Sequence, residues 1–509
     1  MPDLADLLER AAPRDVAPAD LATIASRGRA RRRRRRMGAG AVAVLAVVGA
    51  GAAVIGQIDP ADDPSEQVTA AVAPAPSIRE GMGSWEQLPE LPATGISDVA
   101  PLSDGRLLAW GDERGFVGDD EDPGDAGFQV VVLDRDRTTW TSIPVPAGLP
   151  KTLVAKPALA GDRLLVLAVE VDGSIVGRVL DAATETWTVL PPVPGILVHA
   201  DAVAWDGEQL AVVRTTPGED GPVGLLPGPY DVNDPTSGTV QVDWRVEAPS
   251  TWRWAVGDAA WTEGAPPPLS LRVATGSAFD GTRLAMVGGT TDLGADEPGE
   301  TFADGAVYDL RADEWSALPE VSRPAVHLDV AWIDGRLVVA GGRPSLVIEL
   351  GAEGPDARAV GLAADGVGWE PLTSSPELGA GVSWGSAFTS AEGAQPVIVE
   401  SWPTHDPAEP EGAALVDGTW ETTPTQVLHG WRDGLVATSD DIGNPGSGPF
   451  RTFVRRGASD WVEAAEGPLE NRMGPGVAVV GDDLVVVGGL SGAGLVPERS
   501  AWILDLAAD

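Results

Sequence analysis

One unit recurs along residues 85–509 of this chain, and it restricts the fold more than any other feature. The unit contains an apolar strand, a tight polar turn with Gly, a second apolar strand, a variable loop, a third strand and a Trp that leads into prolines. Asp-Gly favours a hairpin because both central residues of a type I′ turn need positive φ. The eight turns are Asp104-Gly105, Gly161-Asp162, Asp206-Gly207, Asp280-Gly281, Asp334-Gly335, Glu392-Gly393, Asp433-Gly434 and Gly481-Asp482.

A Trp series sets the register of the unit. Six residues lie between a large side chain on the third strand and the Trp, as in Tyr308 and Trp315. A four-stranded propeller blade needs about 40–50 residues, which fits the spacing of the Trp residues. The sequence therefore predicts an all-β propeller of eight four-stranded blades, with seven as the alternative number. The series is Trp85, Trp140, Trp187, Trp261, Trp315, Trp369, Trp420 and Trp461.

The same features resemble those of a known family. The copy with Gly288-Gly289, Tyr308 and Trp315 has a strand that ends in two glycines, then a Tyr position, then the Trp. Two further double glycines are Gly341-Gly342 and Gly488-Gly489. In this, residues 85–509 resemble a kelch-type β-propeller of the galactose oxidase-like propeller superfamily. The resemblance implies the fold, and it implies little about function, because propellers carry many unrelated functions.

The two ends of the repeat region complete each other. The last copy stops at Asp509 before it reaches a Trp strand, whereas Trp85 begins a Trp strand with no copy before it. We expect the 85–92 strand to pair into the last blade and close the propeller, because closure removes open sheet edges.

A second constraint precedes the repeats. Residues 37–57 are 21 uncharged, mostly apolar residues, directly after the arginine run Arg31 to Arg36. A helix needs about 20 residues to cross the hydrocarbon core, and positive charge marks its cytoplasmic side. The sequence predicts a cytoplasmic basic tail (1–36), a transmembrane helix (37–57), a linker (58–84) and an extracytoplasmic propeller (85–509). The protein would lie in the plasma membrane as a single-pass protein.

A cleaved signal peptide is the alternative to a membrane helix. Signal peptides have apolar cores of about 7–15 residues followed closely by a small-residue cleavage site. The first suitable sites, around Ala73 and Ala75, lie well past the apolar run, which favours a retained helix. Only Lys151 and Lys156 are lysines, and this arginine-rich composition is typical of a GC-rich bacterial source.

The tail before the helix carries one pattern. Leu4, Leu7, Leu8 and Ala11 form the stripe of a short amphipathic helix. The tail either fixes topology and contacts anionic lipid or serves as a docking peptide. In the second case the protein is a sensor that signals through its N-terminal tail.

Composition excludes several functions for the propeller. The chain has no Cys, which removes disulfides, thiolate nucleophiles and cysteine metal sites. A net charge of −41 argues against nucleic-acid binding. The four His lie in separate repeats without a metal-binding spacing, and no hydrolase elbow or phosphate loop occurs. The sequence favours a binding or scaffold module for a protein or glycan over an enzyme. The alternative is a cell-surface hydrolase or lyase that uses carboxylates near the propeller channel.

Irregular aromatic residues are the candidate binding residues. The third copy carries an insertion with Tyr230, Trp244, Trp252 and Trp254, and the sixth copy carries Trp402 with His405. Clustered Trp on a loop can stack on sugars or bury in a partner protein. The structural alternative is an extra hairpin that packs on its own blade.

Acidic loops suggest calcium, and we expect no other cofactor. Calcium prefers several oxygen ligands at close range, although no loop here has the full EF-hand pattern. The candidates are Asp120, Asp122, Asp125, Asp231 and Asn233. We expect a monomeric ectodomain.

Overall fold

The structure is a computed structural model in which the chain divides into two compact units, Met1–Ala71 and Val72–Asp509. Every described residue belongs to the second unit, so the predicted tail, the 37–57 helix and most of the linker lie outside the described residues. Among the residues that are described, no helix is long and apolar enough to cross a membrane. The described residues are 80–507 apart from 113–126, 147–148, 150–151, 154–156, 170–173, 195–200, 216–224, 228–238, 242–247, 292–298, 334, 344–359, 373–383, 389–396, 402–411, 417–418, 424–426, 432–433, 439–449, 457–460, 466, 468, 470–471 and 492–495.

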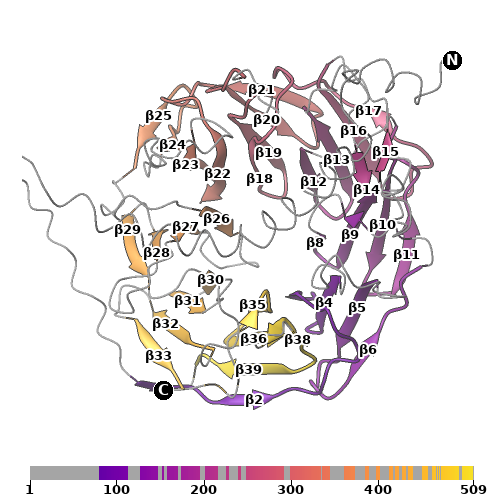
Figure 1. Ribbon diagram of the computed structural model, residues 1–509, viewed down its shortest axis with the longest axis vertical. Coiled ribbons are helices and arrows are strands. Elements are labelled where there is room, and N and C mark those ends of the chain that lie inside the picture. Colours follow the sequence, from indigo (N-terminus) through magenta and orange to yellow (C-terminus); the bar gives the residue numbers. More distant parts are fainter. Residues whose placement is uncertain are drawn as a thin grey trace, which may run out of the picture. The chain divides into compact units, whose positions relative to one another are not determined.

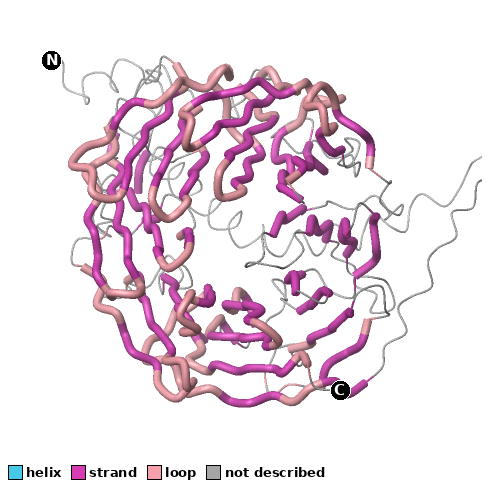
Figure 2. The backbone as a smooth tube through the Cα atoms, turned by 180° about the vertical axis from the view of Figure 1, so that it is seen from behind, coloured by secondary structure: helices cyan, strands magenta, loops and turns pink. Residues whose placement is uncertain are grey.

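The second unit is an all-β propeller with four-stranded antiparallel blades, as the sequence predicts, and its described residues form strands and loops without a helix (Figure 2). In each blade the first strand lies toward the middle and the fourth lies outside (Figure 1). Blade A contains β3 (Asp98–Pro101), β4 (Leu107–Asp112), β5 (Phe128–Leu133) and β6 (Trp140–Ser142). Blade B contains β8 (Ala158–Ala160), β9 (Arg163–Val169), β10 (Ile175–Asp181) and β11 (Thr186–Val189), with β7 (Thr152–Leu153) as a second inner piece. Blade C contains β12 (Ala202–Trp205), β13 (Gln209–Arg214), β16 (Ser250–Ala255) and β17 (Thr262–Glu263), and its insertion forms the hairpin β14 (Leu225–Pro227) and β15 (Thr239–Gln241).

The remaining sheets repeat this order. Blade D contains β18 (Gly276–Phe279), β19 (Arg283–Val287), β20 (Gly305–Asp309) and β21 (Glu314–Leu318). Blade E contains β22 (Val326–Ile333), β23 (Arg336–Arg343), β24 (Val360–Leu362) and β25 (Trp369–Pro371). Blade G contains β30 (Val427–Trp431), β31 (Gly434–Thr438), β32 (Thr452–Arg456) and β33 (Val462–Ala464). Blade H contains β35 (Gly476–Val480), β36 (Asp483–Val487), β39 (Ala501–Asp505) and β2 (Trp85–Gln87).

The structure describes side chains in these seven blades, except on β7 of blade B and β30 of blade G, and seven is the alternative number that the sequence allows. Sheet F, made of β26 (Trp384–Phe388), β27 (Val397–Ser401), β28 (Gly412–Val416) and β29 (Thr419–Thr423), is described by its backbone alone. Sheet F has the same strand order, and it lies next to β22 of blade E and β30 of blade G.

The Asp280-Gly281 pair lies in the turn between β18 and β19, as the sequence predicts, but the turn is not the predicted type I′, because neither Asp280 nor Thr282 has a positive φ. Gly281 has a φ of +89°, which residues with a Cβ rarely adopt. The Asp280 carboxylate accepts hydrogen bonds from the backbone N–H groups of Thr282 (2.9 Å) and Arg283 (2.6 Å). The side chain therefore satisfies turn donors that no strand partner reaches.

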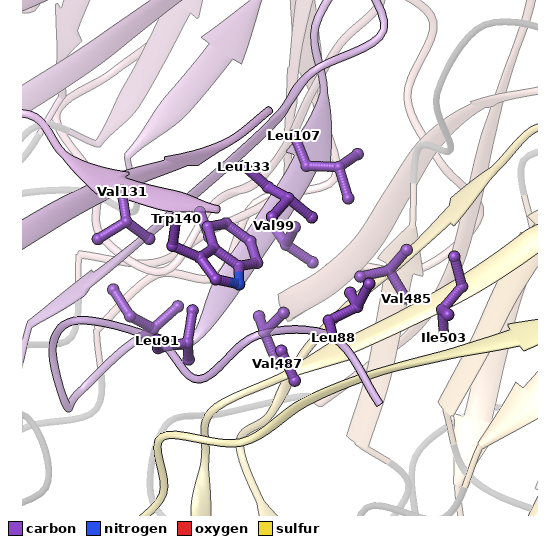
Figure 3. Packing of buried hydrophobic residues seen from close by; sticks show 13 residues of the cluster. Leu88, Leu91, Val99, Leu107, Val131, Leu133, Trp140, Val485, Val487 and Ile503 are labelled. Atoms are coloured by element: carbon purple, nitrogen blue, oxygen red, sulfur yellow. The ribbon is translucent and has the colours of Figure 1, made fainter. Parts of the chain in front are cut away.

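The core lies between neighbouring blades. Along β4, Leu107 and Ala109 pack toward blade H, whereas Leu108 and Trp110 pack toward blade B. Figure 3 shows the first of these interfaces, where Val485 and other residues of blade H meet blade A. Both faces of the sheets in blades A, B, C, D and H pack in such clusters, which is why their second strands read as continuous apolar runs.

Tryptophan indoles join successive blades by one repeated hydrogen bond. At five junctions the indole N–H donates to the carbonyl that lies four residues after the Trp of the preceding blade, as in Trp261 to Pro191 at 2.7 Å. A buried indole needs such an acceptor. The series therefore belongs to the packing between blades. The other four bonds are Trp85 to Ala465, Trp140 to Pro89, Trp315 to Ala265 and Trp369 to Pro319.

The N-terminal strand belongs to blade H. In β2, Trp85, Glu86 and Gln87 pair antiparallel with Leu504, Ile503 and Trp502. The chain continues into the interface with blade A, where Leu88 and Leu91 are buried. Within the segment predicted as a linker, β1 (Glu80–Met82) is a strand that pairs parallel with β33. The sequence offers no apolar alternation there that would have indicated a strand.

Candidate binding face

The strand order gives the propeller two unlike ends. First and third strands run toward one end, and second and fourth strands return to the other. We name the end that carries the connections between strands one and two, and between strands three and four, the turn face. We name the opposite end, where strand two leads to strand three and strand four leads to the next blade, the loop face.

Arginines on the turn face join neighbouring blades. Arg106 of blade A donates to the carbonyl of Ala182 in blade B at 2.8 Å. Arg253 makes the same bond to Leu310 at 3.0 Å, and Arg456 makes it to Leu506 at 2.7 Å. Each acceptor lies just after the third strand of the next blade, so the three bonds are equivalent.

A polar network between blades C and D adds to this. The Asp313 carboxylate accepts from the Tyr308 hydroxyl (2.7 Å) and the Ala265 N–H (2.9 Å), and it pairs with Arg253 (3.1 Å). Desolvation raises the pKa of Asp313, but these donors outweigh it and hold the pKa below its ordinary value. Burial and the Asp313 carboxylate raise the pKa of Tyr308, so its hydroxyl stays protonated. The turn face is thus a set of short turns fixed by hydrogen bonds.

The loop face carries the long and acidic parts of the chain. The connections between second and third strands contain 28 Asp and Glu and 5 Arg in total. Those of blades A, C and D, residues 113–127, 215–249 and 288–304, each carry a net charge of −5. Because these connections begin and end at the loop face, their negative charge favours a positively charged partner at this end.

Blade D shows how such a connection is held at its base. Arg272 is fully buried, and its guanidinium pairs with both carboxylate oxygens of Asp304 at 2.5 and 3.1 Å. The same guanidinium donates to the carbonyl of Gly288 at 3.1 Å and lies 3.9 Å from the ring centre of Phe302. A bidentate, hydrogen-bonded pair compensates the desolvation of a buried charge.

Blade H repeats this arrangement. Arg472 is buried and donates to the carbonyl of Gly488 (2.7 Å) and to the Ser500 hydroxyl (2.6 Å). Arg472 begins a small sheet of three strands, β34 (Arg472–Met473), β37 (Leu490–Ser491) and β38 (Val496–Pro497). Sequence reasoning missed both arginines, although each precedes a double glycine by sixteen residues, which is the signal that would have found them.

Blades C and D are also joined at the loop face. Asp201 accepts from the backbone N–H of Thr215 at 2.5 Å, and the Thr215 hydroxyl donates to the carbonyl of Arg272 at 3.1 Å. Burial lowers the pKa of Arg214 to about 10, and the nearby Asp201 carboxylate opposes that shift. The insertion of blade C therefore starts from a fixed polar base.

One carboxylate on an inner strand is unusual. Asp329 lies in β22, and burial raises its pKa to about 7. Its neighbours Leu328 and Val330 pack in the core between blades D and E, so Asp329 lies on the opposite face of the strand. A carboxyl with such a pKa exchanges protons near neutral pH.

Two predicted binding residues lie in a strand. The expectation that Trp252 and Trp254 lie on a loop is wrong, because both belong to β16, the third strand of blade C. Trp254 is 2 % exposed and its indole donates to the carbonyl of Asp258 at 3.0 Å. Trp252 is half-buried against the core between blades B and C. Both rings pack within the propeller.

The other predicted site residues lie outside the described residues. These are Tyr230, Trp244, Trp402 and His405, and the calcium candidates Asp120, Asp122, Asp125, Asp231 and Asn233. Within the described ranges, no three His, Asp or Glu side chains gather in a way that could hold a metal ion.

Comparison with known proteins adds little. No protein-family model matches the chain, and no curated protein matches it. Among solved structures, one described as "Structure of YjhT" is 14 % identical, with a TM-score of 0.37, and the match covers 66 % of this chain and 99 % of that one.

Proposed function

We propose that this protein is a single-pass membrane protein whose extracytoplasmic propeller binds a protein or glycan through its loop face. The observation that carries the proposal is the contrast between the two faces. The turn face consists of short turns that arginines join by hydrogen bonds. The loop face carries the long acidic connections, and buried arginines such as Arg272 hold the residues where these connections begin and end. Loops on a rigid scaffold are where binding residues concentrate.

The charge of the loop face narrows the choice of partner. With 28 acidic residues against 5 arginines in these connections, an anionic glycan would be repelled. A protein with a basic surface fits better, and its association would be steered by charge and weakened by salt.

The remaining parts of the proposal come from the sequence. The uncharged 37–57 segment after six consecutive arginines supports a plasma-membrane helix with a cytoplasmic tail, which would carry any signal inward. The double glycines and the Trp register support a kelch-type propeller, and the arginine-rich composition with only two lysines supports a bacterial origin. We infer eight blades, because sheet F has the strand order of the others and lies between blades E and G.

Photo-crosslinking tests the binding face. A photoreactive residue replaces Glu300 on the loop face, or Val367 on the turn face as the matched control, in the full chain in its membrane. Both positions are exposed. We expect one protein to be captured from position 300 and lost in high salt, with and without calcium. Equal capture from position 367 would contradict the proposal.

Protease treatment of intact spheroplasts tests the topology. We expect the propeller to be digested from outside while the tail stays protected. A propeller that is cut only after lysis would place it in the cytoplasm.

Asp329 favours one second function, a hydrolase or lyase that uses a carboxylate of an inner strand. A carboxyl with a pKa of about 7 can act as a general acid near neutral pH. Assays on ester and glycoside panels with Asp329→Asn as the control test this. Turnover that Asp329→Asn abolishes would establish an enzyme, and turnover that it leaves unchanged would exclude Asp329.

A further inference from the structure

The N-terminal segment 80–91 contacts three blades in succession. Its first part, β1, adds a fifth and outermost strand to blade G. Its second part, β2, is the fourth strand of blade H. Its last part enters the interface with blade A, where the Pro89 carbonyl accepts from the Trp140 indole at 3.0 Å. The chain enters the propeller through this segment, so the stability of each attachment decides how much of the segment stays bound.

The first attachment is small. In β1 the register pairs Glu80 with Glu463 and Met82 with Ala464, and it shifts between the two pairs. An irregular register disrupts the ladder locally, so β1 is held by a short and imperfect strand pair.

The second attachment is large. Besides the three pairs of β2, the Leu88 N–H donates to Ala501 (3.0 Å) and the Leu91 N–H donates to Arg499 (2.8 Å). The Arg499 side chain donates back to the Leu91 carbonyl at 2.7 Å. The Trp85 indole bond to Ala465 and the burial of Leu88 and Leu91 add further contacts.

A single residue joins the two attachments. Gly83 has a φ of +79°, and a Cβ on it would lie 2.6 Å from the Asp505 carbonyl oxygen. Only glycine fits this close passage from blade G to blade H.

We propose that residues 80–91 form a two-stage latch, in which β1 opens by itself while β2 and the residues after it keep the propeller closed. Opening frees the outer edge of β33 and adds residues 80–83 to the N-terminal arm, about 13 Å of extended chain at about 3.3 Å for each residue. If residues 37–57 span a membrane, as proposed above, the latch sets how far the propeller reaches from it.

Hydrogen exchange on the full chain in detergent tests the latch. We expect the amides of 80–82 to exchange at least tenfold faster than those of 85–91. Gly83→Ala should accelerate exchange in 80–82, because its Cβ would lie 2.6 Å from the Asp505 carbonyl oxygen. Exchange of 80–82 and 85–91 at one shared rate in the wild type and the variant would overturn the proposal.

A disulfide provides an independent test, because the chain contains no other Cys. Met82→Cys with Ala464→Cys joins registered partners of β1 and β33. Oxidation should slow exchange in 80–82 by tenfold or more and leave 85–91 unchanged, with reduction restoring the difference. Failure to form the disulfide, or oxidation without an effect, would show that β1 does not visit this register. Neither result depends on the membrane helix or on the partner of the loop face.

Discussion

The turn face and the loop face are the two ends of the same strands, yet different forces hold them. On the turn face, neighbouring blades are joined through short turns by arginine bonds such as Arg106 to Ala182 and by the Asp313 network. On the loop face, buried arginines such as Arg272 fix the bases of the connections, and the acidic residues lie farther along the chain. Stability should therefore be sensitive to changes at one end, and recognition should be sensitive to changes at the other.

Removal of residues 85–92 should have the largest effect, because it acts on the propeller that both faces share. The deletion opens blade H and exposes the core around Leu88 and Leu91. We expect loss of cooperative thermal unfolding in calorimetry. Removal of residues 72–79 is the control and should leave Tm unchanged, and an unchanged Tm after the first deletion would refute closure by this strand.

Asp313→Ala tests the turn face. It leaves the Tyr308 hydroxyl and the Arg253 guanidinium without their shared acceptor, and a buried polar group without a partner costs about 1–3 kcal/mol. We expect a loss of about 2–3 kcal/mol in urea unfolding with no change in crosslinking from position 300. A loss below about 0.5 kcal/mol would show that the network does not hold the turn face.

Acid should remove the stabilisation that the ionised Asp313 carboxylate provides. The pKa of Asp313 is lowered from 3.8 in the folded protein, so its contribution is present above that value and is lost as pH falls through the folded pKa. Asp313→Asn should thus be less stable than the wild type at pH 7, and the difference should shrink as pH falls from 3.8 through the lowered folded pKa. A difference in stability that stays constant down to the acid unfolding transition would contradict the assignment.

Two Trp→Phe variants compare junctions between blades. Trp261→Phe removes the indole bond to Pro191, whereas the buried Nε1 of Trp187 has no acceptor among the described residues. Both variants lose similar ring area, so Trp261→Phe should cost about 1 kcal/mol more, the usual net value of one hydrogen bond. Equal losses in chemical denaturation would show that the indole bond adds nothing to packing.

Changes on the loop face should affect stability least. Replacement of Asp119, Asp120, Glu121, Asp122 and Asp125 by Ser removes five charges from one connection. Surface substitutions typically change stability by less than about 0.5 kcal/mol. We expect an unchanged Tm and a weaker salt dependence of crosslinking. A large fall in Tm would show that the loop face also contributes to stability, against the difference proposed between the two faces.

The propeller was predictable because its signals are local and repeated. Asp280-Gly281 lies in the turn between β18 and β19, as expected, and Tyr308 and Trp315 are registered partners on adjacent strands. The count of blades was harder to predict, because sheet F carries a Glu392-Gly393 turn and an irregular spacing.

The candidate site was less predictable. Trp252 and Trp254 lie in the third strand of blade C, because the insertion precedes them and the strand follows it. Arg272 pairs with Asp304, which lies 32 positions later in the chain. In β1, Glu80 is registered with Glu463, which lies 383 positions later. Contacts between distant residues leave no periodic pattern along the chain.

The indole bond between blades uses a donor and an acceptor at constant offsets within one repeat. The five junctions that have this bond are therefore assembled from interchangeable parts. Duplication or loss of a whole repeat in the gene would supply both the donor and the acceptor of such a junction. Ring size in such a lineage can change by recombination without the simultaneous invention of a complementary pair.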